Sequence, residues 1–388
     1  MEPMSLAGST VATGGFVDHH THLLKDSAGI PFGWQGTTVR AFHEQVRRDG
    51  VTPMDVPEPA GPGLAAGSGP AAGEPVGELA RRLHRGLSRA AQAGLTEVTE
   101  MGMRRWRYLD ALAAIGQDHP LPARVRIYLA SGLAERSAAA ELESRRSDCG
   151  PWVRLDGVKF YADGWLVPRT CAMCRSFEDE ESDGILFADA TALARRIEPF
   201  AARGWRIATH AIGDRAVETV LDAYELAWGH DRRAVASARP RIEHGSILSV
   251  GLAERIAELG VHVCIQPSFP VTDAAQVPVA LGAVRAATAY RWAALAASGT
   301  PLLLGTDYPI EVIEPLVSLA RLVRGRSDRP GFATPGTAPE HSRIPLGLAM
   351  QLATDESAGR TYLSADPLAG TAQDLDQIEV LGTAPMPF

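Results

Sequence analysis

The stretch Gly15-Phe16-Val17-Asp18-His19-His20-Thr21-His22 is a short apolar run that ends in two histidines spaced one residue apart. Such a run is typical of a buried β-strand. Residues i and i+2 of a strand point to the same side, so His20 and His22 would project together from its end. Two neighbouring imidazoles can begin a metal site, although an isolated His-x-His pair also occurs in solvated loops.

Seven further apolar and β-branched runs follow, separated by segments with apolar residues at three- and four-residue intervals. The predicted strands are Gly14–His20, Leu95–Glu100, Val125–Ala130, Gly157–Ala162, Arg206–His210, Arg239–His244, Val261–Gln266 and Leu302–Thr306. The predicted helices are Thr38–Arg48, Leu79–Ala93, Trp106–Ile115, Ala190–Ala202, Arg215–Trp228, Val250–Leu259, Val284–Ala297 and Ile313–Arg324. This alternation predicts an α/β protein with a (β/α)8 TIM barrel. A doubly wound open sheet is the main alternative, but no G-x-G-x-x-G follows the first strand.

We expect the barrel to occupy residues 1–345. Within it, residues 52–77 are dense in Pro, Gly and Ala, which predicts an irregular loop. Residues 346–388 are expected to form one helix, Leu346–Thr354, and a polar tail with a few short strands that packs on the barrel.

Charge and cysteine content limit the partners. The net charge is -8, which disfavours nucleic acid and anionic membranes as partners. The chain has no apolar stretch long enough for a bilayer and no secretory leader pattern, so we expect a cytoplasmic protein. A homo-oligomer stays open. Cys171-Ala-Met-Cys174 has the spacing of a structural zinc or redox pair, but two incidental thiols are the simpler interpretation because no second C-x-x-C is present.

Lysine is rare in this chain. Only Lys25 and Lys159 are lysines among the 38 basic residues, and the others are arginines. A lysine amine can lose its proton and act as a nucleophile or become carboxylated, whereas arginine cannot. Both lysines are therefore functional candidates, with drift in an arginine-rich composition as the alternative.

The ends of the predicted strands carry the residue types of a metal site. Catalytic residues of a TIM barrel lie at the C-terminal ends of its strands. Those ends hold the following side chains: His20, His22, Lys159, His210, His244 and Asp307. Zinc takes neutral imidazoles and carboxylates, and a carboxylated lysine is an anion that can bridge two metals. The pattern therefore predicts a metal centre at the mouth of the barrel.

The same segments resemble the amidohydrolase superfamily, and most closely its amidohydrolase-3 (YtcJ-like) branch. The resembling segments, in family order, are residues 15–22, 158–164, 209–214, 242–244, 290–292 and 305–309. The resemblance implies that His20, His22 and Asp307 hold one Zn²⁺, that His210 and His244 hold a second, and that carboxylated Lys159 bridges them. Other divalent metals are compatible with this set. The alternative is a one-metal site in which a plain Lys159 pairs with Asp307 or Asp163.

Two features depart from the family pattern. Family members usually carry tens of residues before the His-x-His strand, and these pair with the C-terminus in a small β-sandwich. Here about 14 residues precede the strand, and the usual C-terminal Gly-Lys-x-Ala-Asp segment is missing. We therefore expect the sandwich to be absent or vestigial.

Five further residues are candidates for substrate binding, each with a plainer alternative. Asp163 binds substrate or caps the following loop. Trp165 forms a specificity wall or belongs to an ordinary loop, and Lys25 binds a substrate carboxylate or is solvated. Glu100 faces the site or makes a rim salt bridge, and Gln266 ends the seventh predicted strand within reach of the pocket.

These observations predict a metal-dependent hydrolase that cleaves a C–N bond of an amide, N-formyl group or cyclic amide in a small molecule. In the expected reaction a metal-bound hydroxide attacks the carbonyl carbon, and Asp307 moves the proton to the leaving nitrogen. The resemblance supplies this substrate class, because the ligand set alone equally fits ester or deaminase chemistry. The alternatives are a one-metal deaminase-type hydrolase and a metal-binding barrel that has lost catalysis.

Overall fold

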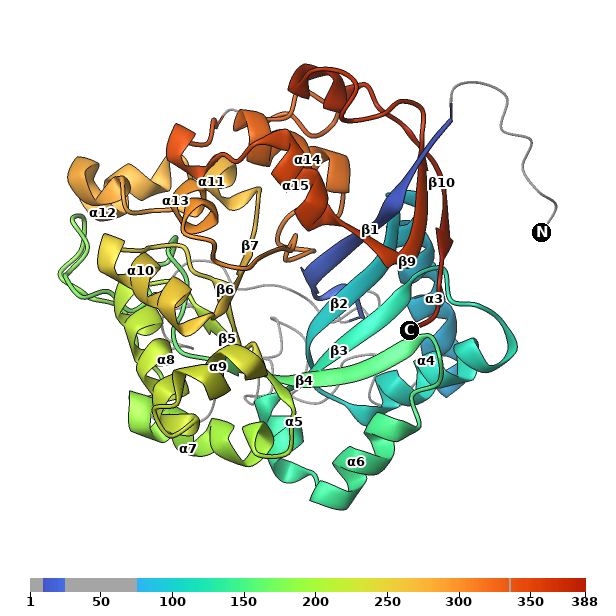
Figure 1. The fold of residues 1–388 in the computed structure, drawn as a ribbon, viewed down its shortest axis with the longest axis horizontal. Coiled ribbons are helices and arrows are strands. Elements are labelled where there is room, and N and C mark those ends of the chain that lie inside the picture. Colours follow the sequence, from blue (N-terminus) through green and yellow to red (C-terminus); the bar gives the residue numbers. More distant parts are fainter. Residues whose placement is uncertain (1–9, 25–74, 335) are drawn as a thin grey trace, which may run out of the picture.

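The computed structural model describes residues 10–24, 75–334 and 336–388, and a parallel β-sheet forms its centre (Figure 1). All eight predicted strands are present, with ends that differ from the predicted ones by a few residues. They are β1 (Val11–Thr21), β2 (Leu95–Met103), β3 (Arg124–Ala130), β4 (Val153–Tyr161), β5 (Arg206–Ala211), β6 (Arg241–His244), β7 (His262–Ile265) and β8 (Leu302–Leu304). Each strand pairs in parallel with the next one along the chain.

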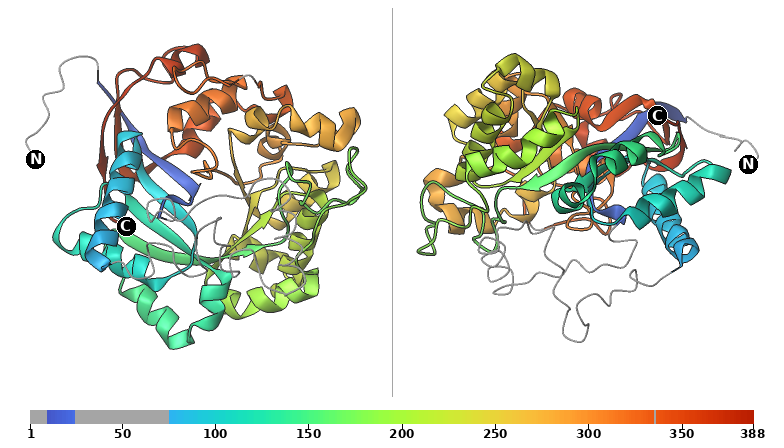
Figure 2. Two further views of the ribbon diagram at one scale, coloured as in Figure 1. Left: turned by 180° about the vertical axis from the view of Figure 1, so that it is seen from behind. Right: turned by 90° about the horizontal axis from the view of Figure 1, so that it is seen from below.

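Helices cover the outside of this sheet (Figures 1 and 2). They are α3 (Val76–Gln92), α4 (Trp106–Asp118), α5 (Ser131–Arg136), α6 (Ala139–Ser147), α7 (Ala190–Ala201), α8 (Asp214–Ala227), α9 (Arg232–Ala238), α10 (Val250–Leu259), α11 (Phe269–Thr272), α12 (Gln276–Ala286), α13 (Trp292–Ala297), α14 (Pro315–Arg324) and α15 (Leu346–Ala353). This order confirms the predicted α/β fold of the TIM-barrel type. Within the described ranges, no helix combines the length and the apolar character needed to cross a membrane.

Helix α10 shows how local signals set the ends of an element. The Ser249 side chain accepts a hydrogen bond from the backbone N of Leu252, which caps the first turn. Gly260 ends the helix in the left-handed conformation, with φ 64°. Its buried residues, Ala253, Ile256 and Leu259, recur every three positions and face the core. The predicted bounds, 250–259, are the observed ones.

The prediction of one continuous helix over Val284–Ala297 is wrong. Helix α12 ends at Ala286 and α13 begins at Trp292. Between them the backbone forms hydrogen bonds with the segment after β6 instead of helical ones. Tyr290 N donates to the carbonyl of Ser246 (2.6 Å), and Thr288 O accepts from the N of Leu248. Tyr290 also takes a positive φ of 55°. These long-range hydrogen bonds hold the segment after β6 and interrupt the helical pattern.

The first strand also meets the segment that follows β8. Asp307 N donates to His20 O, and His22 N donates to Tyr308 O, both at 2.7 Å. The Asp18 carboxylate accepts from Thr306 N (3.0 Å) and from Thr306 Oγ1 (2.6 Å). These bonds hold β1 beside the end of β8, at the edge of the sheet that carries the histidines.

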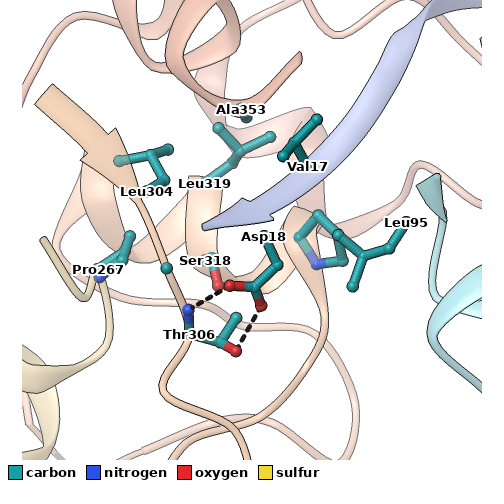
Figure 3. Close-up of a pocket in the computed structure, with 11 residues that line it drawn as sticks. Val17, Asp18, Leu95, Pro267, Leu304, Thr306, Ser318, Leu319 and Ala353 are labelled. Atoms are coloured by element: carbon teal, nitrogen blue, oxygen red, sulfur yellow. Dashed lines mark hydrogen bonds between the residues drawn. The ribbon is translucent and has the colours of Figure 1, made fainter. Parts of the chain in front are cut away.

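A small pocket lies at this junction of β1 and β8, and Figure 3 shows the Asp18 carboxylate bonded to Thr306 beside it. Its lining is largely apolar and comes from both strands and from α14 and α15. The lining residues are Val17, Asp18, Leu95, Pro267, Leu304, Gly305, Thr306, Pro315, Ser318, Leu319 and Ala353. The pocket thus lies between the sheet and the two outer helices α14 and α15.

The C-terminal segment adds two strands, β9 (Thr354–Leu363) and β10 (Val380–Pro385). Strand β9 pairs antiparallel with the first half of β1, from Val11 opposite Leu363 to Phe16 opposite Thr354, and β10 pairs with β9. Figures 1 and 2 show these strands beside β1. In the described residues all ten strands belong to one sheet, which β9 and β10 extend at the β1 side. These two strands do not form a separate β-sandwich, the domain that we expected to be absent or vestigial. The domain division at residue 345 stays a prediction.

Some predicted elements fall outside the described residues. These are the helix Thr38–Arg48 and most of the loop at 52–77. Helix α3 begins at Val76, so the last two residues of that predicted loop are helical.

Candidate metal centre

The six predicted ligands lie at one edge of the sheet. They are His20 and His22 at the end of β1, Lys159 near the end of β4, His210 on β5, His244 on β6 and Asp307 after β8. All six side chains are buried. The parallel strands place these ends together although the residues span most of the chain.

The imidazoles and the carboxylate lie close to one another. Asp307 Oδ1 is 3.3 Å from both His20 Nε2 and His22 Nε2. The ring centroids of His20 and His244 are 5.1 Å apart, and those of His210 and His244 are 4.5 Å apart. Ligand atoms of His20, His244 and Asp307 all lie within 4.8 Å of one another. This spacing is suited to donors that share a cation.

Hydrogen bonds fix three of the rings. His20 Nδ1 donates to Glu243 Oε2 (2.5 Å), and His244 Nδ1 donates to Gln266 Oε1 (2.8 Å). His210 Nε2 donates to the carbonyl of Gly164 (3.0 Å). In each case the accepting oxygen places the proton on that nitrogen and leaves a lone pair on the other one. The three rings are therefore oriented as metal ligands are.

The protonation states also fit a cation site. Burial lowers the pKa of His244 to about 3 and that of His210 well below its usual value. Burial alone would raise the pKa of Asp307, but the charges and hydrogen bonds of His20 and His22 hold it well below the usual value. Near pH 7 His210 and His244 are thus neutral imidazoles and Asp307 is an ionised carboxylate, which are the forms that bind metals.

Lys159 belongs to the same buried cluster. Its side chain is fully buried, and its Nζ has no hydrogen-bond partner among the described residues. Burial lowers the pKa of the amine to about 8, against the opposing charges of Glu243 and Asp307. An unpartnered buried amine is costly to leave in place, so this atom fits a residue that carries a bridging group when the site is filled.

Backbone geometry helps to bring the ligands together. His244 and Asp307 take positive φ angles of 77° and 60°. His244 directly follows Glu243, and a regular strand would point the two to opposite faces. The left-handed turn at His244 breaks that alternation, so both side chains serve the site. Such conformations are uncommon for residues other than glycine and concentrate at functional sites.

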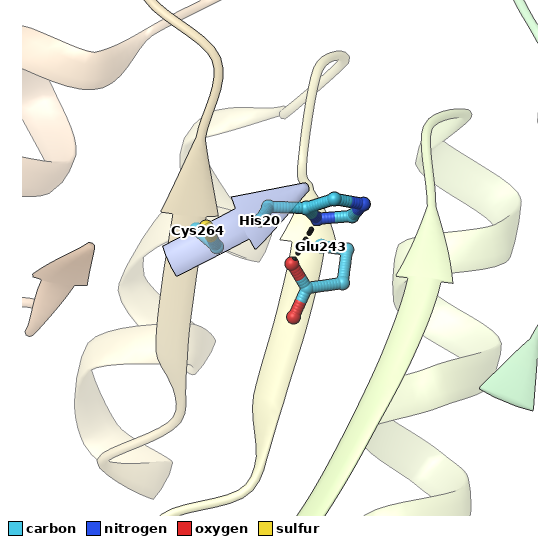
Figure 4. Close-up of side chains that lie close together, drawn as sticks. All are labelled: His20, Glu243 and Cys264. Carbon is cyan, nitrogen blue, oxygen red and sulfur yellow. Dashed lines mark hydrogen bonds and ion pairs between the residues drawn. The ribbon is translucent and has the colours of Figure 1, made fainter. Parts of the chain in front are cut away.

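Glu243 and Arg241 support His20 from β6, and the sequence analysis did not single them out. Arg241 holds both carboxylate oxygens of Glu243, through Nε at 2.5 Å and Nη2 at 3.0 Å, and Nη2 also donates to His19 O. Figure 4 shows His20 of β1 against Glu243, with Cys264 of β7 nearby. The i, i+2 spacing of Arg241 and Glu243 was the available signal.

The Asp163 carboxylate binds backbone N–H groups of neighbouring segments. Its carboxylate accepts from the backbone N of Ala172 (2.9 Å), Ile212 (3.0 Å) and Gly213 (2.8 Å). Burial raises its pKa to about 7 despite these bonds. The geometry therefore favours the loop-capping interpretation, since these contacts fasten the segment after β4 to the end of β5.

The other substrate candidates have different positions. Gln266 contacts His244, as described above, and so supports a ligand. Glu100 Oε2 accepts from the backbone N of Leu24 (2.9 Å), which holds the chain after β1. Trp165 is half-buried and packs against the core. Lys25 lies outside the described residues. Contact of any of these with substrate stays a prediction.

The Cys171/Cys174 pair carries no second sign of a metal or redox role. Cys171 is buried, Cys174 is exposed, and both are free thiols. Among the described residues, the groups close enough to hold a metal do not include either cysteine.

Tyr161 is another residue that the sequence analysis passed over. Its ring stacks on that of His210, with centroids 5.2 Å apart and an interplanar angle of 27°. It lies two residues after Lys159 on β4, and that i+2 spacing was the signal that could have identified it.

Comparison with known proteins gives matches over most of the chain. The profile described as "Amidohydrolase family" matches residues 63–366, which leaves His20 and His22 outside the matched range. The chain is 30% identical over 268 residues to the "Putative amidohydrolase YtcJ" of Bacillus subtilis (strain 168), covering 65% of this chain and 50% of that protein. The chain thus spans about half the length of this relative.

Solved structures share the fold. An uncharacterised metal-dependent hydrolase from Pyrococcus furiosus is 21% identical, with a TM-score of 0.66 over 97% of this chain and 86% of that one. A Xaa-Pro dipeptidase with bound methionine is 14% identical, with a TM-score of 0.54 over 98% of this chain and 87% of that one. At these identities the likeness shows the architecture.

Proposed function

This chain belongs to the amidohydrolase family, and on that premise we propose that it is a metal-dependent hydrolase of C–N bonds in small molecules. The bond that we propose is that of an amide, an N-formyl group or a cyclic amide. The observation that carries the proposal is the convergence of four buried histidines with Asp307 and the unpartnered Nζ of Lys159.

The donor set suits divalent cations, with Zn²⁺ as the first choice. In the proposed arrangement His20, His22 and Asp307 would hold one ion and His210 and His244 a second, and a carboxylated Lys159 would supply a negative charge to both. A bound cation would polarise the scissile carbonyl and lower the pKa of a water molecule next to it.

Asp307 is the proposed general base and acid. The His20 and His22 contacts keep its carboxylate ionised near neutral pH, so it can accept a proton from the attacking water. It would then deliver that proton to the leaving nitrogen, which must be protonated to depart as an amine. Glu243 and Gln266 keep His20 and His244 in the required orientation.

Metal analysis combined with a substrate panel tests this function. The panel contains N-acyl amino acids, N-formyl amines, lactams and dipeptides, so that non-peptide and peptide C–N bonds are compared directly. We expect about two metal equivalents per chain and turnover of a non-peptide substrate. His84→Ala is the control, because His84 is exposed on α3. A metal-replete protein that is inert to the whole panel would instead favour the binding barrel.

Lys159→Ala tests the shared ligand. Loss of the bridging group should lower the metal content and reduce activity by several orders of magnitude. Full activity with two bound metals in this variant would refute the carboxylated-lysine bridge. An aminated heterocycle added to the panel tests the deaminase alternative, which one bound metal in the wild type together with release of ammonia from this compound would support.

A further inference from the structure

We propose that the Tyr161 hydroxyl donates a hydrogen bond to the carbonyl oxygen of the substrate, next to the metal centre. This inference rests on the proposed function and deepens it, because it assigns a group of this chain to the atom on which negative charge develops. Tyr161 is not one of the six proposed metal ligands.

The position of Tyr161 is fixed by β4 and β5. Tyr161 and Lys159 are two residues apart on β4, so they share a face of the strand. Across the sheet Tyr161 lies opposite His210 in the parallel register. The phenol ring stacks on the His210 ring at 5.2 Å, and Lys159 Nζ lies 5.1 Å from the phenol centroid. The ring is thus held against two of the proposed metal ligands.

The hydrogen bonding of the Tyr161 hydroxyl differs from that of other buried tyrosines. None of the hydrogen bonds among the described residues involves this hydroxyl, and the residue keeps 9% of its surface exposed. Two other buried tyrosines differ. Tyr224 OH donates to Thr209 Oγ1 or Arg241 O, at 2.9 and 2.8 Å, and Tyr290 OH donates to Asp273 Oδ2 at 2.5 Å. Since tyrosine hydroxyls in protein interiors usually have a partner, the hydroxyl of Tyr161, which is held against two proposed ligands, is free to donate to a bound substrate.

A donor at this position fits the chemistry of C–N hydrolysis. Attack of water on the carbonyl carbon moves an electron pair onto the carbonyl oxygen, and collapse of the tetrahedral species returns it as the C–N bond breaks. A hydrogen bond to that oxygen is therefore stronger in the transition state than in the bound substrate. Tyr161 would accelerate turnover rather than substrate capture.

Tyr161→Phe is the test, because it removes the hydroxyl and keeps the ring that stacks on His210. With the best substrate of the panel, we expect kcat to fall by about 100-fold while KM changes by less than about 3-fold. Metal content should equal that of the wild type. The matched control is Tyr362→Phe, on β9 in the C-terminal extension, which should leave kcat and KM unchanged. An unchanged kcat in Tyr161→Phe would overturn the proposal.

A binding measurement separates this inference from the proposed function. Calorimetry with acetohydroxamate on the metal-loaded protein measures recognition of a carbonyl oxygen without turnover. We expect Tyr161→Phe to bind about 10-fold more weakly than the wild type. Weaker binding by this variant with no turnover of the panel by the wild type would refute the hydrolase and keep the Tyr161 contact. Equal affinity of the two proteins, or binding by neither, would overturn the contact.

Discussion

At the scale of single residues, the candidate centre depends on side chains that hold other side chains. His20 is oriented by Glu243, and Glu243 is held in turn by the Arg241 guanidinium. Burial alone would raise the pKa of Glu243, but the charges of Arg241 and Lys159 hold it well below its usual value. An ionised acceptor strengthens the His20 Nδ1–H bond and so the donor character of Nε2.

Glu243→Gln should weaken metal binding. The amide keeps the shape of the side chain but removes the charge that orients and polarises His20. We expect the Kd for Zn²⁺ to rise by about 10- to 100-fold, measured by competition with a chromogenic chelator. Glu254→Gln, at an exposed position of α10, is the control. An unaltered Kd in Glu243→Gln would show that the contact does not support the ligand.

His262, at the start of β7, predicts acid sensitivity away from the metal centre. Burial, together with the charges of Arg241, Arg239 and Arg206, lowers its pKa to about 4. Between about pH 6.5 and 4 the unfolded chain binds a proton at this residue and the folded chain does not, so the free energy of unfolding falls as the pH falls. Above pH 7 the residue contributes nothing to this dependence.

His262→Gln should therefore reduce the loss of stability on acidification. Urea unfolding at pH 7.5 and at pH 4.5 measures the free energy of unfolding for both proteins. We expect the difference between the two pH values to be smaller in the variant than in the wild type. A difference as large as that of the wild type would assign the acid sensitivity to other groups.

At the scale of elements, the site depends on close contact between β1 and the end of β8. Gly305 follows β8, and a Cβ atom placed there would lie 2.4 Å from the Cβ of His20. A real side chain cannot approach so closely, so only glycine fits at position 305, where this segment passes β1.

Gly305→Ala should separate β1 from β8 and displace His20. We expect destabilisation of about 1–3 kcal/mol from overpacking, together with loss of bound metal. Thermal unfolding and metal analysis measure the two effects. Gly347→Ala is the control, because a Cβ on this exposed helical glycine meets nothing within 4 Å. Normal metal content in Gly305→Ala would show that the strands tolerate the separation.

At the scale of the whole molecule, a cation in the candidate centre would join strands from both halves of the chain. Its proposed ligands come from β1, β4, β5, β6 and the segment after β8. A ligand that binds only the folded chain stabilises it by mass action, by about 4 kcal/mol at a thousand times its Kd. The barrel and the centre should therefore be coupled in stability.

Removal of metal with a chelator should lower the Tm, and added Zn²⁺ should restore it. Differential scanning calorimetry of the metal-loaded and chelated protein measures the shift. His84→Ala should show the full shift, whereas His20→Ala should lose most of it. Equal Tm values for the loaded and the chelated wild type would contradict a structural coupling of the centre to the barrel.

Local sequence patterns were enough to predict the order of the eight parallel strands and the residues at their ends, but not the helices α5, α6, α9 and α11. These patterns are apolar periodicity, cap residues such as Ser249 and Gly260, and alternation along a strand. It also identified the six candidate ligands, because a parallel barrel gathers the ends of its strands at one edge. Whether those six bind metal stays a prediction.

Which residues support one another became visible in the packed chain. Glu243 lies 223 residues from His20, and no local pattern reports such a pair. The break between α12 and α13, the loop-holding role of Asp163 and the stacking of Tyr161 on His210 likewise depend on distant partners. Periodicity describes how a segment folds by itself, whereas hydrogen bonds and close contacts between strands are set only when the whole chain has packed.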